Sequence, residues 1–137
     1  MRVLITGGAG YIGTHTMLEV LGVGNDVCVI DNFSNSSPEA LARVKTLSNR
    51  TFDFFQTDTR DRKDLIVRVK EFAPDAIIHF AGLKAVSESV ELPLEYYENN
   101  VQGTINLLQA MKAASCKNIV FSSSATVYGD PDFLPIT

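Results

Sequence analysis

The sequence contains few residues that could form a metal site or a disulfide framework. It has two cysteines, Cys28 and Cys116, and two histidines, His15 and His79, and none of them stands at the spacing of a metal site. Cys28 lies in an apolar run over residues 27–30, which indicates a small buried side chain. Two thiols in a chain of this kind are typical of a reduced, intracellular protein. We expect no metal, and we expect each histidine to be packed or hydrogen-bonded.

Positive charge and long apolar runs are also scarce. The chain has 12 Lys and Arg against 16 Asp and Glu, which gives a formal net charge of −4. Nucleic acids and anionic membranes attract basic surfaces, so neither is an expected partner. No stretch approaches the roughly 18 apolar residues of a membrane helix, and the apolar run over residues 1–5 is too short for a signal peptide. The expected compartment is the cytoplasm.

The 137 residues, 45 % of them hydrophobic, allow one domain with a buried core. Short apolar runs alternate with longer amphipathic segments. We predict strands over residues 3–6, 26–30, 52–56, 76–80 and 118–122, and helices over residues 12–22, 38–47, 61–72 and 93–114, with a loop before the last helix and an aperiodic tail over residues 129–137. This alternation predicts an α/β fold, a Rossmann-type doubly wound parallel sheet of five strands in the order 3-2-1-4-5.

The last predicted helix has an apolar arc wider than a helix lying on a sheet needs. The arc combines two adjacent faces, formed by Val101, Ile105 and Leu108 and by Leu107, Ala110 and Ala114. Either a further element packs on this helix, or a partner helix lies outside the chain. The alternative is an exposed surface that is merely rich in alanine.

A glycine motif follows the first predicted strand and opens the first helix. Gly7, Gly10 and Gly13 have the spacing GxxGxxG. One glycine makes the tight turn, another lets the backbone approach a pyrophosphate, and the third lets the helix pack close to the strand. The helix start attracts phosphates. Asp31, at the end of the second strand, can accept hydrogen bonds from ribose hydroxyls and repels a 2′-phosphate, so the pattern favours NAD over NADP.

Other candidate residues stand at the ends of the later strands, where this topology places its ligand crevice. Asp58 ends the third strand and either meets an adenine edge or caps a helix. The small residues after Phe80 let a cofactor approach the backbone. Alternation along the fifth strand would put Ser122 and Ser124 on one side and Ser123 on the other. These serines either orient a substrate or cap backbone groups at the strand end.

Several segments resemble the UDP-glucose 4-epimerases, a family of extended short-chain dehydrogenases/reductases that acts in galactose metabolism. The matching segments are residues 6–13, 31–32, 79–86, 88–90, 93–97, 99–100 and 121–129. The glycine motif is shared across the superfamily, whereas residues 79–100 and 121–129 are specific to the epimerases. The resemblance covers the whole chain.

The resemblance implies a role for each candidate residue. The pyrophosphate would meet the backbone of Tyr11 and Ile12, and the adenosine ribose would be surrounded by Asp31, Asn32, Phe33, Asn35 and Ser36. The adenine would be held by Asp58 and the backbone of Thr59, and the nicotinamide side by Phe80, Ala81, Gly82, Lys84 and Asn99. Ser124 would bind the sugar 4-hydroxyl. The family's reaction moves a hydride from C4 of a UDP-sugar to NAD and returns it to the opposite face of the 4-keto sugar.

The family's catalytic pair is missing from this sequence. The resemblance requires Tyr-x-x-x-Lys on the helix after the fifth strand, in which lysine lowers the pKa of the tyrosine. Tyr96, Tyr97 and Tyr128 have no lysine four residues later. We therefore expect an N-terminal fragment that lacks the UDP-binding domain, binds NAD weakly and does not epimerise. With the tyrosine-bearing helix of the family's dimer bundle absent and the fifth strand left as an open edge, we expect self-association or a homodimer.

Two other functions fit parts of the pattern. A nucleotide-sugar 4,6-dehydratase would carry Asp-Glu where this chain has Ala125 and Thr126, so elimination lacks its acid and base. A non-catalytic NAD-sensing module would keep the cofactor site without the catalytic pair. A natural stop at Thr137 would favour the sensor over the enzyme.

Overall fold

Five parallel strands form one sheet in the computed structural model, which describes residues 1–130 and 133, apart from the side chains of residues 125 and 126. The strands are β1 (Arg2–Thr6), β2 (Asp26–Asp31), β3 (Asp53–Gln56), β4 (Ala76–His79) and β5 (Asn118–Phe121). Their order, β3-β2-β1-β4-β5, confirms the predicted topology. Most of the predicted tail over residues 129–137 lies outside the described residues.

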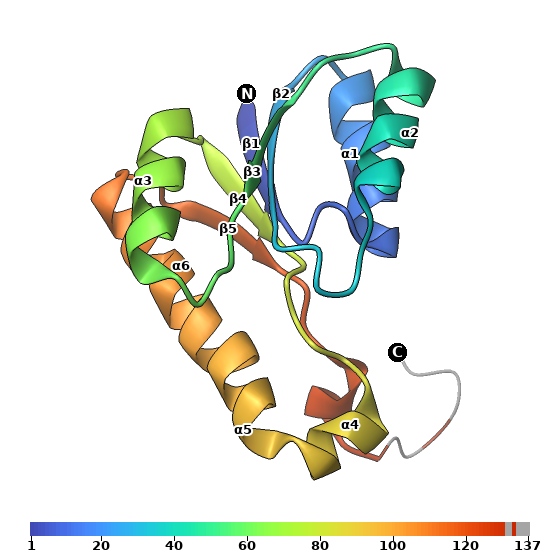
Figure 1. Ribbon diagram of the computed structural model, residues 1–137, viewed down its shortest axis with the longest axis vertical. Helices are drawn as coiled ribbons and strands as arrows, with labels where there is room; N and C mark the ends of the chain where they lie inside the picture. The colour runs from blue at the N-terminus through green and yellow to red at the C-terminus, as the bar shows by residue number, and fades with distance from the viewer. Residues whose placement is uncertain (131–132, 134–137) are drawn as a thin grey trace.

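Helices cover both faces of the sheet (Figure 1). On one face lie α1 (Tyr11–Gly22) and α2 (Pro38–Ser48), and on the other lie α3 (Arg62–Phe72) and α6 (Gly103–Ala113). Successive strand residues point to opposite faces, so Val3 and Ile5 pack with α1 and α2 while Leu4 packs with α3 and α6. Each strand therefore needs apolar residues at consecutive positions, which is why the strands appear in the sequence as continuous apolar runs.

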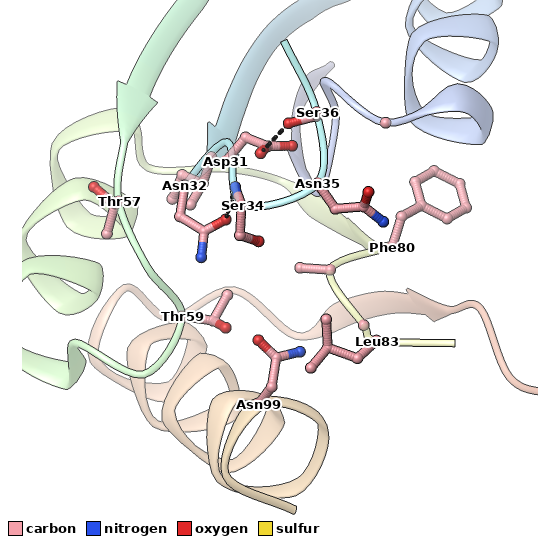
Figure 2. A pocket seen from close by; sticks show the side chains of 15 residues that line it. Asp31, Asn32, Ser34, Asn35, Ser36, Thr57, Thr59, Phe80, Leu83 and Asn99 are labelled. Atoms are coloured by element: carbon pink, nitrogen blue, oxygen red, sulfur yellow. Dashed lines mark hydrogen bonds between the residues drawn. The ribbon is translucent and has the colours of Figure 1, made fainter. Parts of the chain in front are cut away.

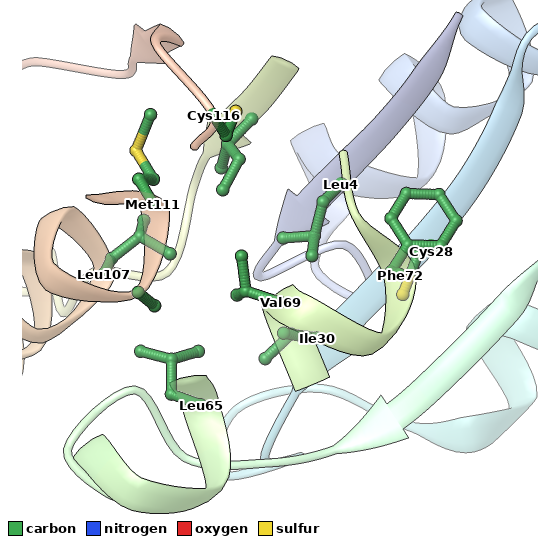
Figure 3. Close-up of a cluster of buried hydrophobic side chains, with 11 residues drawn as sticks. Leu4, Cys28, Ile30, Leu65, Val69, Phe72, Leu107, Met111 and Cys116 are labelled. Atoms are coloured by element: carbon green, nitrogen blue, oxygen red, sulfur yellow. The ribbon is translucent and has the colours of Figure 1, made fainter. Parts of the chain in front are cut away.

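The core between the sheet and α3 and α6 contains both cysteines (Figure 3). Cys28 is fully buried and Cys116 is 7 % exposed, and neither forms a disulfide. Burial raises the pKa of the Cys28 thiol to about 12, with smaller contributions from Asp53 and Glu71. Cys28 is thus a small buried apolar side chain, as the sequence predicts.

Two helices on opposite faces begin at side-chain caps. Ser37 accepts a hydrogen bond from Glu39 N at 3.2 Å, with Pro38 in the first turn of α2. Asp61 accepts from the backbone N–H groups of Lys63 and Asp64, each at 3.1 Å. Asp61 is therefore the cap of α3, whereas the sequence placed it as the first helical residue.

The segment between β4 and α6 differs from its prediction. The expected loop contains a short helix, α4 (Val86–Glu91), and the expected single helix over residues 93–114 consists of α5 (Pro93–Tyr96), the π-helix η1 (Tyr97–Gln102) and α6. Helix α4 has no buried residue, so it has no apolar periodicity to reveal it. It is held by polar contacts instead, since the Tyr96 hydroxyl lies 2.7 Å from Glu88 Oε2 and accepts from Ala85 N at 3.1 Å.

Within the described residues, no helix combines the length and the apolar character needed to cross a bilayer.

A buried histidine connects the sheet to α6. His79, 3 % exposed, has its Nδ1 2.6 Å from Thr6 Oγ1 and its Nε2 3.1 Å from Thr104 Oγ1. The Thr104 hydroxyl donates its proton to Asn100 O at 2.6 Å, so it accepts from His79 Nε2–H. His79 is then neutral, with Nδ1 accepting from Thr6. Burial, and then the charge of Lys84, lower the pKa of His79 from 6.5 to about 4.

This shift predicts a stability that depends on pH. The unfolded chain takes up a proton below its ordinary histidine pKa, whereas the folded chain does so only near pH 4. The contribution is therefore complete above the unfolded pKa and is lost as the pH falls toward 4. Between pH 7.5 and 5, the free energy of unfolding should fall by about 2 kcal/mol. Urea titrations should show this fall in the parent chain and most of it missing in His79→Gln; equal slopes in both would contradict the assignment.

Candidate functional site

An open cavity of about 610 Å³ lies at the carboxyl ends of the strands (Figure 2). It is formed by the loops that follow β1, β2, β3 and β4, by the last two residues of β2 and by one residue of η1. Its lining residues are Gly7, Gly10, Ile30, Asp31, Asn32, Ser34, Asn35, Ser36, Thr57, Thr59, Phe80, Ala81, Gly82, Leu83 and Asn99. The chain runs from β1 to β2 on one side and reaches β4 on the other, so the crevice opens where the strand order reverses.

The glycine loop after β1 lies against the backbone of the loop that follows β4. Gly7 has a φ of +69°, and a Cβ there would lie 2.6 Å from Ala81 N. A Cβ on Gly13, in the first turn of α1, would overlap Gly7 O and would lie 2.7 Å from Gly8 Cα. Gly10 is the N-cap of α1, and no side chain caps this helix. The backbone at Tyr11 and Ile12, where the helix begins, therefore has no side-chain cap. These contacts produce a bare helix start beside the cavity, which suits an anionic group.

Asp31 ties the glycine loop to the loop after β2. Its Oδ2 accepts from Ala9 N at 3.0 Å, and its Oδ1 accepts from Phe33 N at 2.9 Å and from the Ser36 hydroxyl at 2.8 Å. Asp31 is 8 % exposed and lines the cavity. Phe33 does not line the cavity. It has a φ of +59°, and its ring packs on Phe54 at 5.1 Å between centroids, which fixes the turn of this loop.

Asp58 is held beside the cavity and not in its lining. Arg60 donates to it through Nε at 3.0 Å and through an η nitrogen at 2.8 Å, and Asn32 Nδ2 donates at 2.9 Å. The Arg60 hydrogen bonds lower the pKa of Asp58 from 3.8 to about 2, so this carboxylate is ionised at neutral pH. The alternative of a helix cap is wrong, because Asp61 caps α3.

Lys84 and Ser124 line a second cavity, of about 550 Å³, which shares Phe80, Ala81 and Gly82 with the first. Lys84 Nζ donates to Ser122 O at 3.2 Å. The predicted alternation of the three serines is wrong, because β5 ends at Phe121 and all three line this cavity. The chain turns there, with Ser123 N donating to Phe121 O at 3.0 Å. The side chains of Ala125 and Thr126, named in the dehydratase comparison, lie outside the described residues.

Most predicted cofactor residues therefore meet at the first cavity. Those outside its lining are Tyr11, Ile12, Gly13, Phe33, Asp58 and Lys84, and the lining residues that sequence reasoning missed are Ile30, Ser34, Thr57 and Leu83. Each missed residue adjoins a predicted one near the end of a strand. Because ligands in this topology bind at the carboxyl ends of the strands, including one or two further positions on each side of the predicted residues would have found them. In the described part of the chain, no three His, Cys, Asp or Glu side chains gather as a metal site would require.

Known proteins share this arrangement. A family model described as the NAD dependent epimerase/dehydratase family matches residues 3–137. The UDP-glucose 4-epimerase of Haemophilus influenzae is 56% identical over 137 residues, 100% of this chain and 40% of that protein, and the human UDP-glucose 4-epimerase is 54% identical over 98% of this chain and 40% of that protein. The crystal structure of UDP-glucose 4-epimerase from Bifidobacterium longum, in complex with NAD+ and UDP, has a TM-score of 0.95 and 51% identity over 100% of this chain and 41% of its own. The chain thus spans about 40% of the length of the relatives it matches.

The contact at Gly13 predicts that two glycines of α1 respond oppositely to alanine. Gly13→Ala places a methyl group against backbone that cannot move away, so it should lower the free energy of unfolding by about 3 kcal/mol. Gly22→Ala, the matched control, adds its methyl group to open space and should raise that free energy by about 0.5 kcal/mol. Urea unfolding measures both. A loss below about 1 kcal/mol at Gly13 would mean that the loop is not packed as described.

Proposed function

Because this chain belongs to the NAD dependent epimerase/dehydratase family, we propose that its 137 residues are the NAD-binding domain of a UDP-glucose 4-epimerase. The complete enzyme would interconvert UDP-glucose and UDP-galactose through a 4-keto intermediate. The observation that carries the proposal is the cavity between the glycine loop and Asp31, at the reversal of strand order. The relatives it matches extend well beyond its length, and we assign the binding of the UDP moiety to residues outside these 137.

The residues in and around the first cavity support the assignment of NAD as its ligand. The start of α1, at Tyr11 and Ile12, would bind the pyrophosphate, because the absent Cβ atoms at Gly7 and Gly13 let this backbone come close. The adenosine ribose would bind at Asp31, with Asn32, Asn35 and Ser36 around it. Asp31 already accepts three hydrogen bonds, and a ribose hydroxyl would share or replace the one from Ser36.

The remaining groups follow the cavity away from Asp31. The ionised Asp58 accepts hydrogen bonds only, so it suits the amino group of adenine, beside the backbone of Thr59. Phe80, Ala81, Gly82 and Asn99 would hold the nicotinamide side, and Lys84 would reach it from the second cavity.

The second cavity suits the sugar. Ser124 lines it, and its hydroxyl would hold the 4-hydroxyl of the substrate in place. When bound, NAD would supply the hydride acceptor and donor for C4 of the sugar. The tyrosine and lysine that move the proton in this family have no counterpart within the 137 residues. This chain by itself should therefore not epimerise, and conversion of UDP-glucose to UDP-galactose by it alone would overturn that part of the proposal.

We also assign the protein to the reducing cytoplasm. Cys28 and Cys116 are both unpaired and buried in one core, where a small apolar side chain serves as well as a thiol. Neither position depends on an oxidising compartment.

Calorimetric titration with NAD and with NADP tests the proposed cofactor. The Asp31 carboxylate repels a 2′-phosphate, so NAD should bind at least about tenfold more tightly than NADP, a difference of about 1.4 kcal/mol. Asp31→Asn should remove most of this preference. Asp26→Asn, at the opposite end of β2 and exposed, is the matched control and should keep it. If neither dinucleotide binds the parent chain, the proposed function fails.

The exposed apolar face of the helical segment formed by η1 and α6 predicts self-association. Val101, Ile105 and Leu108 are 49 %, 42 % and 49 % exposed, whereas Leu107 and Ala110 on the adjacent face are buried. Strand β5 is an open edge of the sheet, and its Val120 and Phe121 are exposed. We propose that this surface pairs with a second copy. Sedimentation should show dimers that Ile105→Glu shifts toward monomer, while Val67→Glu, an exposed valine on α3, leaves them intact. A parent chain that stays monomeric at high concentration would exclude the proposal.

A further inference from the structure

One continuous helical segment, η1 followed by α6, contacts two of the loops that form the first cavity. These are the β3 loop (residues 57–60) and the β4 loop (residues 80–84). Figure 2 shows Asn99, from this segment, in the cavity lining with Thr59 and Leu83, one from each loop. The contacts behind that lining come from two further asparagines, Asn100 and Asn106.

Both ends of the Asn100 side-chain amide form hydrogen bonds with the backbone of the β4 loop. Its Oδ1 accepts from Leu83 N at 2.8 Å, and its Nδ2 donates to Leu83 O at 2.9 Å. The orientation of the amide is fixed, because Leu83 N can only donate and Leu83 O can only accept. Leu83 lies beyond the end of β4, so no strand partner satisfies these groups. Asn100 takes that role and sets where this wall of the cavity lies.

Asn106 binds the β3 loop through one end of its amide. It is 2 % exposed, and its Nδ2 donates to Thr59 O at 3.0 Å and to Arg60 O at 3.1 Å. Its Oδ1 accepts from Gln102 Nε2 at 2.9 Å, which completes the amide. Next to this contact, a Cβ on Gly103 would lie 2.7 Å from Thr59 Oγ1, so the loop rests directly on the helix.

The π-turn supplies part of this set of side chains. It spans Tyr97–Gln102 and contains Asn99, Asn100 and Gln102, whereas Asn106 follows in α6. Short π-helical segments are frequent at functional sites. The segment is also fixed to the sheet, because Asn100 O accepts from Thr104, which accepts in turn from His79. The positions of the two loops are therefore set by one helical segment that is fixed to the sheet.

We infer that Asn100 and Asn106 are positioning residues that set the two walls of the cofactor cavity, through their amide contacts with Leu83 and with Thr59 and Arg60. Neither lines the first cavity, and Asn100 lines the second. The inference rests on the proposed function for which end of NAD each wall meets: Asn106 positions the adenine end, and Asn100 positions the nicotinamide end.

The test separates the two ends with two ligands. ADP carries only the adenosine and phosphates, whereas NAD fills the cavity. Asn106→Leu should weaken both ADP and NAD about tenfold, as expected when a loop loses its hydrogen-bonded anchor. Asn100→Leu should weaken NAD about tenfold and ADP less than about twofold. Gln109→Leu, an exposed residue of the same helix, is the matched control and should change neither.

A general loss of folding would not produce this split. If both variants weaken ADP and NAD alike, or if Asn100→Leu leaves NAD affinity unchanged, the inference is overturned. Should Asn106→Leu fail to fold, Gln102→Leu removes the hydrogen bond that orients Asn106 without touching the core, and it should weaken both ligands in the same direction.

Amide hydrogen exchange without any ligand keeps this inference separate from the proposed function. Exchange at Leu83 should be faster in Asn100→Leu and unchanged in Gln109→Leu, whether or not the chain binds NAD. A parent chain that binds neither ADP nor NAD would refute the proposed function alone. If the Leu83 amide exchanges at the same rate in Asn100→Leu and in the parent chain, the positioning role of Asn100 is refuted.

Discussion

The cavity depends on a contact between two stretches of backbone, one from the turn after β1 and one from the start of the β4 loop. At Gly7 the chain comes so close to Phe80 and Ala81 that no side chain fits between them. The same turn packs under Gly13, which brings the first turn of α1 down onto it. Any Cβ here would push the helix start away from the strand ends. The bare N–H groups of that helix start would then no longer face the place where a pyrophosphate would lie.

The other walls are built around this contact by polar groups that are almost all satisfied within the chain. Asp31 joins the glycine loop to the loop after β2, and Arg60 and Asn32 hold Asp58. Among the described residues, no buried side-chain nitrogen or oxygen lacks a hydrogen-bond partner. A cavity whose walls are already bonded to one another is preorganised, so a cofactor that enters it does not have to order the loops.

The two cavities and the exposed apolar surface have different proposed roles. Both cavities are open: the first lies among the loops that follow β1, β2, β3 and β4, and the second lies at the end of β5, the edge strand of the sheet. The exposed apolar face of Val101, Ile105 and Leu108 lies on the helical segment formed by η1 and α6. By the proposal, the first cavity belongs to the cofactor half of the site and the second cavity to the sugar half.

The sequence by itself determined the sheet, its order, the glycine loop and Asp31, because these leave local marks: continuous apolar runs, a glycine spacing, and a carboxylate at a strand end. It did not reveal α4, which buries nothing, or the π-turn, since an apolar period near four residues describes α and π segments almost equally. The contacts that shape the cavity were decided only by the tertiary structure. Asn106 meets Thr59 across 47 residues of sequence, and His79 meets Thr6 across 73. An asparagine on a helix looks the same in sequence whether it faces solvent or grips a distant loop, because its partner is a backbone group that every residue carries.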